Sequence, residues 1–150
     1  MIAERLKQSF DRYFEAPIEA WEQFAYQCEL VKFRKNETIK PAGSAEKNGY
    51  FILSGSGGVF IWKENNQVCL DLMYENTFFA DYMSLITGQP TELETIALEN
   101  SEMLKISGAS IEQLKRTPMG QILFLISAEH SFVEKQQQQT QAQRAKAKKA

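Results

Sequence analysis

The chain has 150 residues, which is the usual size of one domain and long enough to bury a single hydrophobic core. Its formal net charge of −2 hides an asymmetry, because residues 135–150 carry five cations and no acid and so leave −7 on residues 1–134. An acidic body disfavours nonspecific binding to DNA and to anionic membranes, since both rely on clustered Lys and Arg. We expect residues 1–134 to form one domain and residues 135–150 to form a basic tail rich in Gln, Ala and Lys.

Nothing in the sequence indicates export or membrane insertion. No segment approaches the roughly 18 consecutive apolar residues of a membrane-spanning helix, and the N-terminus lacks the basic and then apolar order of a signal peptide. The two cysteines, Cys28 and Cys69, are too few for a disulfide framework and lack the spacing of metal ligands. We therefore expect a cytoplasmic protein with reduced thiols and no membrane partner.

The spacing of apolar residues changes from helical to strand-like at Cys28. Helices are predicted over residues 3–14 and 17–27. Short strands separated by Gly, Asn and Pro turns follow over residues 30–34, 37–40, 50–53, 58–63, 68–74, 94–98 and 103–106. A short helix over residues 80–87 interrupts them and is closed by Gly88 and Pro90. The pattern predicts a mainly β domain with flanking helices, of the small barrel or jelly-roll type.

A short helix over residues 110–116 and a long helix that begins at Pro118 end the chain. The long helix carries residues at alternating spacings of four and three, namely Met119, Leu123, Ile126, His130 and Val133. We interpret this stripe as the seam of a homodimer, which weakens where the basic tail begins. His130 of one copy would face His130 of the other, so we expect dimer affinity to fall between about pH 7 and 5.5. The tail itself is expected to be a solvated, disordered segment or a frayed helix end, a linker, or a weak electrostatic arm for nucleic acid.

Four segments carry a likeness to a known family. They are Tyr50–Gly55 (YFILSG), Glu75–Ser84 (ENTFFADYMS), Ile96–Asn100 (IALEN) and Met103–Ser107 (MLKIS). In order, spacing and residue type they resemble the effector domain of CRP/FNR transcription regulators, above all the divergent members common in Bacteroidetes. The resemblance covers roughly residues 5–134. It implies a double-stranded β-helix, which is a jelly roll like that of cyclic-nucleotide-binding domains, followed by a long dimerisation helix.

The same resemblance locates a ligand cassette. Members that bind cyclic nucleotides carry a Gly-Glu pair that holds the ribose and a later Arg-Ser or Arg-Thr pair that holds the phosphate. Counting from Asn76 places the cassette-equivalent positions at Ala80, Asp81, Tyr82, Thr91 and Glu92.

The cassette arginine is missing, because no arginine lies between Arg34 and Arg116. Glu92 stands beside its place, and a carboxylate there repels a phosphate. Asp81 lies at the start of the short helix, where it can either cap the helix N–H groups or contact a ribose hydroxyl. We therefore expect the domain to keep the fold and to have lost cAMP and cGMP binding.

Other chemistry has few candidate residues. His130 is the only histidine and lies on the long helix, so the barrel has no His-based triad and no multi-histidine metal centre. We expect no enzyme activity, no metal and no cofactor. Phe60, Trp62 and Tyr74 could line a pocket for an apolar or planar effector, or could fill a closed core. Strand alternation places Phe60 and Trp62 on one face, which we expect to be the interior.

The sequence thus predicts the effector-sensing and dimerisation domain of a CRP/FNR-type regulator, adapted to an unknown effector or to none. In that family a helix-turn-helix domain follows, and no such pattern follows Val133. DNA would then be bound only through a domain absent from this chain. The alternative is a stand-alone cyclic-nucleotide or small-molecule binding module that acts through protein partners.

Overall fold

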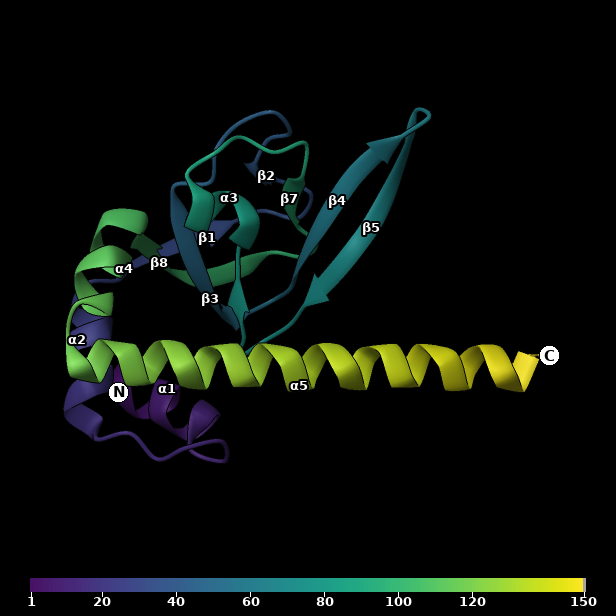
Figure 1. The fold of residues 1–150 in the computed structure, drawn as a ribbon. Coiled ribbons are helices and arrows are strands. Elements are labelled where there is room, and N and C mark those ends of the chain that lie inside the picture. The colour runs from purple at the N-terminus through teal and green to yellow at the C-terminus, as the bar shows by residue number, and fades with distance from the viewer. Residues whose placement is uncertain (150) are drawn as a thin grey trace.

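The computed structural model describes the backbone of residues 1–149 and the side chains of residues 1–141 and 144. Its centre is two four-stranded antiparallel sheets, ordered β1-β8-β3-β6 and β2-β7-β4-β5. The strands are β1 (Glu29–Phe33), β2 (Thr38–Lys40), β3 (Asn48–Ser54), β4 (Gly57–Lys63), β5 (Asn66–Met73), β6 (Phe78–Phe79), β7 (Glu94–Ala97) and β8 (Ser101–Ser107). The mainly β jelly roll predicted from the sequence is confirmed (Figure 1).

Within residues 1–149, five helices accompany the roll. They are α1 (Ile2–Phe10), α2 (Ile18–Tyr26), α3 (Tyr82–Thr87), α4 (Gly108–Lys115) and α5 (Pro118–Lys149). Figure 1 shows α5 as a straight rod that runs past one end of the roll, and α1, α2 and α4 contact it. Across residues 1–149, none of these helices is long and apolar enough to cross a membrane. The predicted basic tail continues α5 to Lys149, whereas Ala150 and the side chains of Lys146, Lys148 and Lys149 lie outside the described residues.

Strand β3 separates two hydrophobic cores. Successive side chains of a strand point to opposite faces, and β3 is buried on both. Phe51 and Leu53 face the core formed with the helices. Tyr50 and Ile52 face the interior of the roll. The interior of the roll is therefore filled by side chains of its own strands.

Phe60, Trp62 and Tyr74 do not fill that interior. Val59 is buried with Ile52 in the interior of the roll. Because successive side chains of a strand point to opposite faces, Phe60 and Trp62 point away from that interior. The hairpin of β4 and β5 also extends beyond the rest of the roll (Figure 1). Trp62 is 55% exposed and Tyr74 is 53% exposed, while Phe60 is half-buried. The prediction that Phe60 and Trp62 face the interior is wrong, because alternation places them on the face opposite to that of Val59, which is buried in the interior.

The α5 stripe packs against this chain's own helices. Leu123 and Ile126 are buried in the core with α1 and α2, and Met119 packs at its edge. The His130 ring lies 4.9 Å from the ring of Phe10 and 5.1 Å from that of Tyr13, between centroids.

The interpretation of Met119, Leu123, Ile126 and His130 as a seam between two copies is therefore corrected: in this structure they form an intrachain core. Val133, the last residue of the stripe, is 38% exposed. The correction has a physical cause, since helical periodicity reports that one face is buried but not which element covers it. Homodimerisation itself stays a prediction.

The burial of His130 makes the stability of the fold depend on pH. Burial lowers the pKa of His130, nearby Arg12 lowers it further, and Glu134, whose carboxylate lies 3.8 Å from Nε2, opposes both. The pKa of His130 is therefore lower in the folded than in the unfolded protein. Its contribution to the free energy of unfolding is complete above the unfolded-state pKa of about 6.5 and is lost as the pH falls through the folded-state pKa.

We expect His130→Asn to cost about 1–2 kcal/mol at pH 7.5 and clearly less at pH 5. Urea unfolding of both proteins at the two pH values measures this. If the unfolding free energy fell equally in wild type and variant between pH 7.5 and pH 5, His130 would not be the source of the pH dependence.

Candidate functional site

Helix α3 starts and ends with specific caps. The Asp81 carboxylate accepts a hydrogen bond from the backbone N–H of Ser84 at 3.2 Å. Gly88 adopts a left-handed conformation, with φ of 74°, and donates to the Ser84 carbonyl at 2.8 Å. The capping interpretation of Asp81 is confirmed, and one carboxylate oxygen is committed to the helix.

The other Asp81 oxygen pairs with a cation from the opposite sheet. Nζ of Lys40, the last residue of β2, lies 3.2 Å from Oδ2 of Asp81. Both side chains are buried, at 3% and 0% exposure. The ammonium also donates to the Thr91 hydroxyl at 2.9 Å and to the carbonyls of Leu93 at 2.7 Å and Thr91 at 3.2 Å. The Thr91 hydroxyl in turn donates to the Asp81 carboxylate. We call Lys40, Asp81 and Thr91 the cassette triad.

The triad corrects the expectation of a site without a cation. The cassette arginine is absent, but Lys40 brings a positive charge to Asp81 and Thr91 from a different strand. That charge is already neutralised by Asp81, and the three N–H groups of the ammonium are shared among four protein oxygens. An incoming anion would have to displace Asp81 from the cation. In the sequence, Lys40 is only a lysine within the predicted strand 37–40, and nothing there indicates a role at this site.

The remaining cassette-equivalent residues have different surroundings. Ala80 is buried beside Asp81. Tyr82 is 40% exposed and borders a cavity outside the roll. Glu92 is exposed to solvent, so water screens the repulsion that the sequence assigned to it. Of the five positions, the structure brings together Ala80, Asp81 and Thr91.

Glu46 adds a second buried acid near the triad. Its backbone N–H donates to Oγ of Ser84 at 2.7 Å, and its side chain is only slightly exposed, with Oε2 unpartnered among the described residues. Burial raises the pKa of Glu46 from about 4.5 to about 7, and the Asp81 charge adds to this effect. The Asn48 and Asp81 backbone N–H groups and the Lys40 charge lower it in part. Glu46 is therefore poised to ionise near neutral pH.

No metal cluster accompanies these groups within the described part of the chain, where no three His, Cys, Asp or Glu side chains gather. The charged and polar groups at the start of α3 are thus paired with one another within the protein. Its parts are one cation, one carboxylate in contact with it, and one hydroxyl that bridges the two.

Comparison with known proteins identifies the family to which this arrangement belongs. Residues 30–117 match the model of the cyclic nucleotide-binding domain. The chain belongs to the cyclic nucleotide-binding domain family. The match spans the whole roll and α4, so it includes all three residues of the cassette triad. No curated protein matches the sequence.

Solved structures share the fold of this cyclic nucleotide-binding domain at low identity. A cyclic nucleotide-binding domain from Methylobacillus flagellatus KT has a TM-score of 0.76 at 13% identity, over 91% of this chain and 79% of that one. The catabolite activator protein of Thermus thermophilus has a TM-score of 0.65 at 17% identity, over 85% and 60%. The c-di-GMP responsive global regulator CLP of Xanthomonas campestris has a TM-score of 0.63 at 19% identity, over 77% and 58%. The domain thus covers about three fifths of each regulator.

We expect Lys40→Met to destabilise the domain by about 3–5 kcal/mol, because it leaves the Asp81 charge buried without a counterion. Lys32→Met is the matched control, since Lys32 forms an exposed pair with Glu102 at 3.8 Å and should change stability by less than about 1 kcal/mol. Urea unfolding at pH 7.5 compares the two variants. Similar small losses in both would refute a buried pair.

Glu46→Gln should make the domain more stable at high pH relative to wild type. The folded-state pKa of Glu46 is raised, so its contribution is complete below about pH 4.5 and is lost as the pH rises through about 7. From pH 5 to pH 8.5, the difference in unfolding free energy between the variant and wild type should shift by up to about 3 kcal/mol in favour of the variant. Glu92→Gln, which removes an exposed carboxylate, should show no such divergence. Chemical unfolding across this pH range tests both variants.

Proposed function

We propose that this chain is the effector-sensing and dimerisation domain of a CRP/FNR-type transcription regulator, and that it does not bind cAMP or cGMP. Family membership and the fold shared with two bacterial regulators support the regulator role. The cassette triad is the observation that supports the lack of cAMP and cGMP binding. In it, Asp81 is already paired with the cation that a cyclic phosphate would need.

The energetics favour the internal carboxylate over an external phosphate. Asp81 is covalently part of the chain and already ordered by its hydrogen bond to Ser84, so it pays no association entropy. A phosphate would have to expel it, and an unpaired buried carboxylate costs several kcal/mol. Lys40 also lacks the planar fork with which an arginine binds two phosphate oxygens at once.

Dimerisation would use a face of α5 other than its buried stripe. Leu125 is 64% exposed and Phe132 is 75% exposed. They lie seven residues apart, which is two helical turns and therefore one face. Two large exposed apolar side chains on a long helix suit contact with a second copy. We propose that specific DNA binding belongs to a helix-turn-helix domain outside this chain, that the protein is cytoplasmic, and that it has no catalytic role.

A stand-alone binding module that acts through protein partners is the second candidate. The exposed apolar face of α5 is the observation that favours it, since the same face could receive another protein. Sedimentation analysis separates the two candidates. A dimer that Leu125→Glu weakens and Glu64→Gln, on the exposed turn between β4 and β5, leaves intact supports the regulator, whereas a monomer at 100 µM or so supports the module.

Isothermal titration calorimetry tests the loss of nucleotide binding. We expect wild-type protein to show no saturable heat with cAMP, cGMP or cyclic di-GMP up to about 1 mM, which bounds the binding free energy near −4 kcal/mol. Asp81→Asn, which keeps an oxygen for the α3 cap but frees Lys40, should gain weak binding. Micromolar binding by wild type that Lys40→Met abolishes would overturn the proposal.

A further inference from the structure

Three charged side chains are buried close together at the start of α3. Two of them, Lys40 and Asp81, neutralise each other. The third, Glu46, is 6% exposed and forms no ion pair with any side chain that the structure describes. Its Oε1 accepts a hydrogen bond of 3.3 Å from the backbone N–H of Asn48, while Oε2 has no donor among the described residues. With Glu46 ionised, the cluster therefore carries one negative charge in excess.

The excess charge favours a proton on Glu46. A buried carboxylate without a cation is costly, and taking up a proton removes that cost. The titratable groups that face Glu46 are Lys40 from β2, Asp81 from the start of α3 and Tyr50 from β3. Burial, and then the Glu46 charge, raise the pKa of Tyr50 to about 12, so this phenol stays neutral near pH 7. Burial raises the pKa of Glu46 itself to about 7, so its charge changes close to neutrality.

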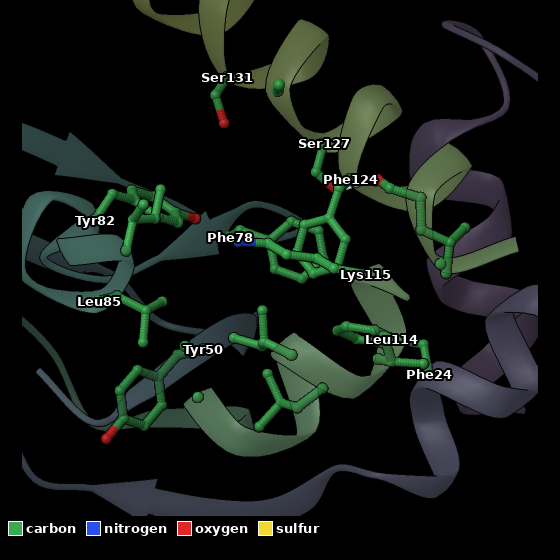
Figure 2. Close-up of a pocket in the computed structure, with 18 of the residues that line it drawn as sticks. Phe24, Tyr50, Phe78, Tyr82, Leu85, Leu114, Lys115, Phe124, Ser127 and Ser131 are labelled. Carbon is green, nitrogen blue, oxygen red and sulfur yellow. Dashed lines mark hydrogen bonds between the residues drawn. The ribbon is translucent and has the colours of Figure 1, made fainter. Parts of the chain in front are cut away.

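Helix α3 is held in place by few side-chain contacts. Ser84 is the one buried residue of this helix, and Ile86 is exposed. On the side toward α5 the helix borders a cavity of about 740 Å³ instead of a packed core. Figure 2 shows Leu85 of α3 on one side of this cavity and Ser131 of α5 on another. The helix therefore has room to move, and the polar contacts of its first turn fix its position.

The loop that carries Glu46, residues 41–47, supplies several of those polar contacts. The backbone N–H of Glu46 donates to Oγ of Ser84 at 2.7 Å, and this hydroxyl donates to the Gln89 carbonyl at 2.6 Å. The N–H of Gly43 donates to the Thr91 carbonyl at 2.7 Å. The loop is therefore joined both to α3 and to the segment that follows it.

The same loop reaches α4. Lys47 follows Glu46, and its carbonyl accepts a hydrogen bond of 2.8 Å from the N–H of Gly108, the first residue of α4. Helix α4 in turn contacts α5. A displacement of the loop would thus act on α3 and on the helices that lead to α5.

We propose that Glu46 is a regulatory proton-binding site, and that its ionisation releases α3 from the roll. Protonated Glu46 is neutral, stays buried and keeps the 41–47 loop against α3. When the proton passes to solvent, the carboxylate repels Asp81 and moves toward water, so the loop and α3 separate. The inference rests on the proposed effector-sensing role and names the proton as the effector in place of a nucleotide.

Carbon-13 NMR of the glutamate carboxyl groups measures the protonation directly. In wild type we expect one glutamate to titrate with a midpoint between about pH 6 and 8, and Glu46→Gln should remove that signal. Glu64→Gln removes an exposed carboxyl on the turn between β4 and β5 and should leave the midpoint unchanged. If every glutamate of the wild type titrates below about pH 5.5, Glu46 is not a proton-binding site and the proposal is wrong.

Hydrogen exchange measures whether α3 follows the proton. The N–H of Leu85 donates to the Asp81 carbonyl at 2.9 Å, and that of Gly88 to the Ser84 carbonyl at 2.8 Å. Protection factors correct for the pH dependence of intrinsic exchange. From pH 6 to pH 8, those of Leu85 and Gly88 should fall about tenfold in wild type and stay constant in Glu46→Gln.

Ile52, which is fully buried in β3, is the reference for global unfolding. Leu85 and Gly88 should exchange faster than Ile52 at both pH values, because α3 opens locally. If they exchange at the rate of Ile52, or keep constant protection factors while Glu46 titrates, the carboxyl affects only global stability and the regulatory role is wrong.

The calorimetry with cyclic nucleotides is independent of these results. Micromolar nucleotide binding would overturn the proposed function without altering the titration of Glu46. A Glu46 that does not titrate near neutrality would overturn the proton site and leave the pairing of Lys40 with Asp81 intact.

Discussion

The buried contact between Lys40 and Asp81 is the constraint on which the site depends. It joins the end of β2 in one sheet to the start of α3, which follows β6 in the other. Neither charge could be buried alone, and Thr91 bridges them so that the hydrogen-bonding groups are satisfied within the protein. One interaction therefore joins the two sheets of the roll at the cassette-equivalent positions.

A second constraint positions the long helix. Phe10 stacks on Trp21 at 5.2 Å and on Phe78 at 5.3 Å, and the His130 ring meets it edge-on. This cluster joins α1, α2, the roll and α5. The same packing leaves α5 standing away from α3, and the cavity lies in the space between them. The position of α5 and the shape of the cavity are therefore two consequences of one core.

The candidate site was only partly predictable. Asp81 as a helix cap and the absence of the cassette arginine follow from local order and spacing, because a cap depends on residues three apart. Lys40 could not be assigned, since it is 41 positions from Asp81 and a lysine in a short strand usually reaches solvent. Phe60 and Trp62 were placed on the wrong face, because alternation shows which residues of a strand share a face but not which face is the interior, and here the buried Val59 marks the other face.

The sequence by itself determined the order of helices and strands, the jelly-roll class, the acidic body with its basic end, and the lack of an arginine for phosphate. These properties reside in composition and in short periodicities. Only the tertiary structure decided which partner neutralises Asp81, which helices cover the stripe of α5, and where the chain leaves a cavity. Periodicity reveals that a face is buried, but the identity of what covers it depends on contacts between segments distant in sequence, which no local pattern contains.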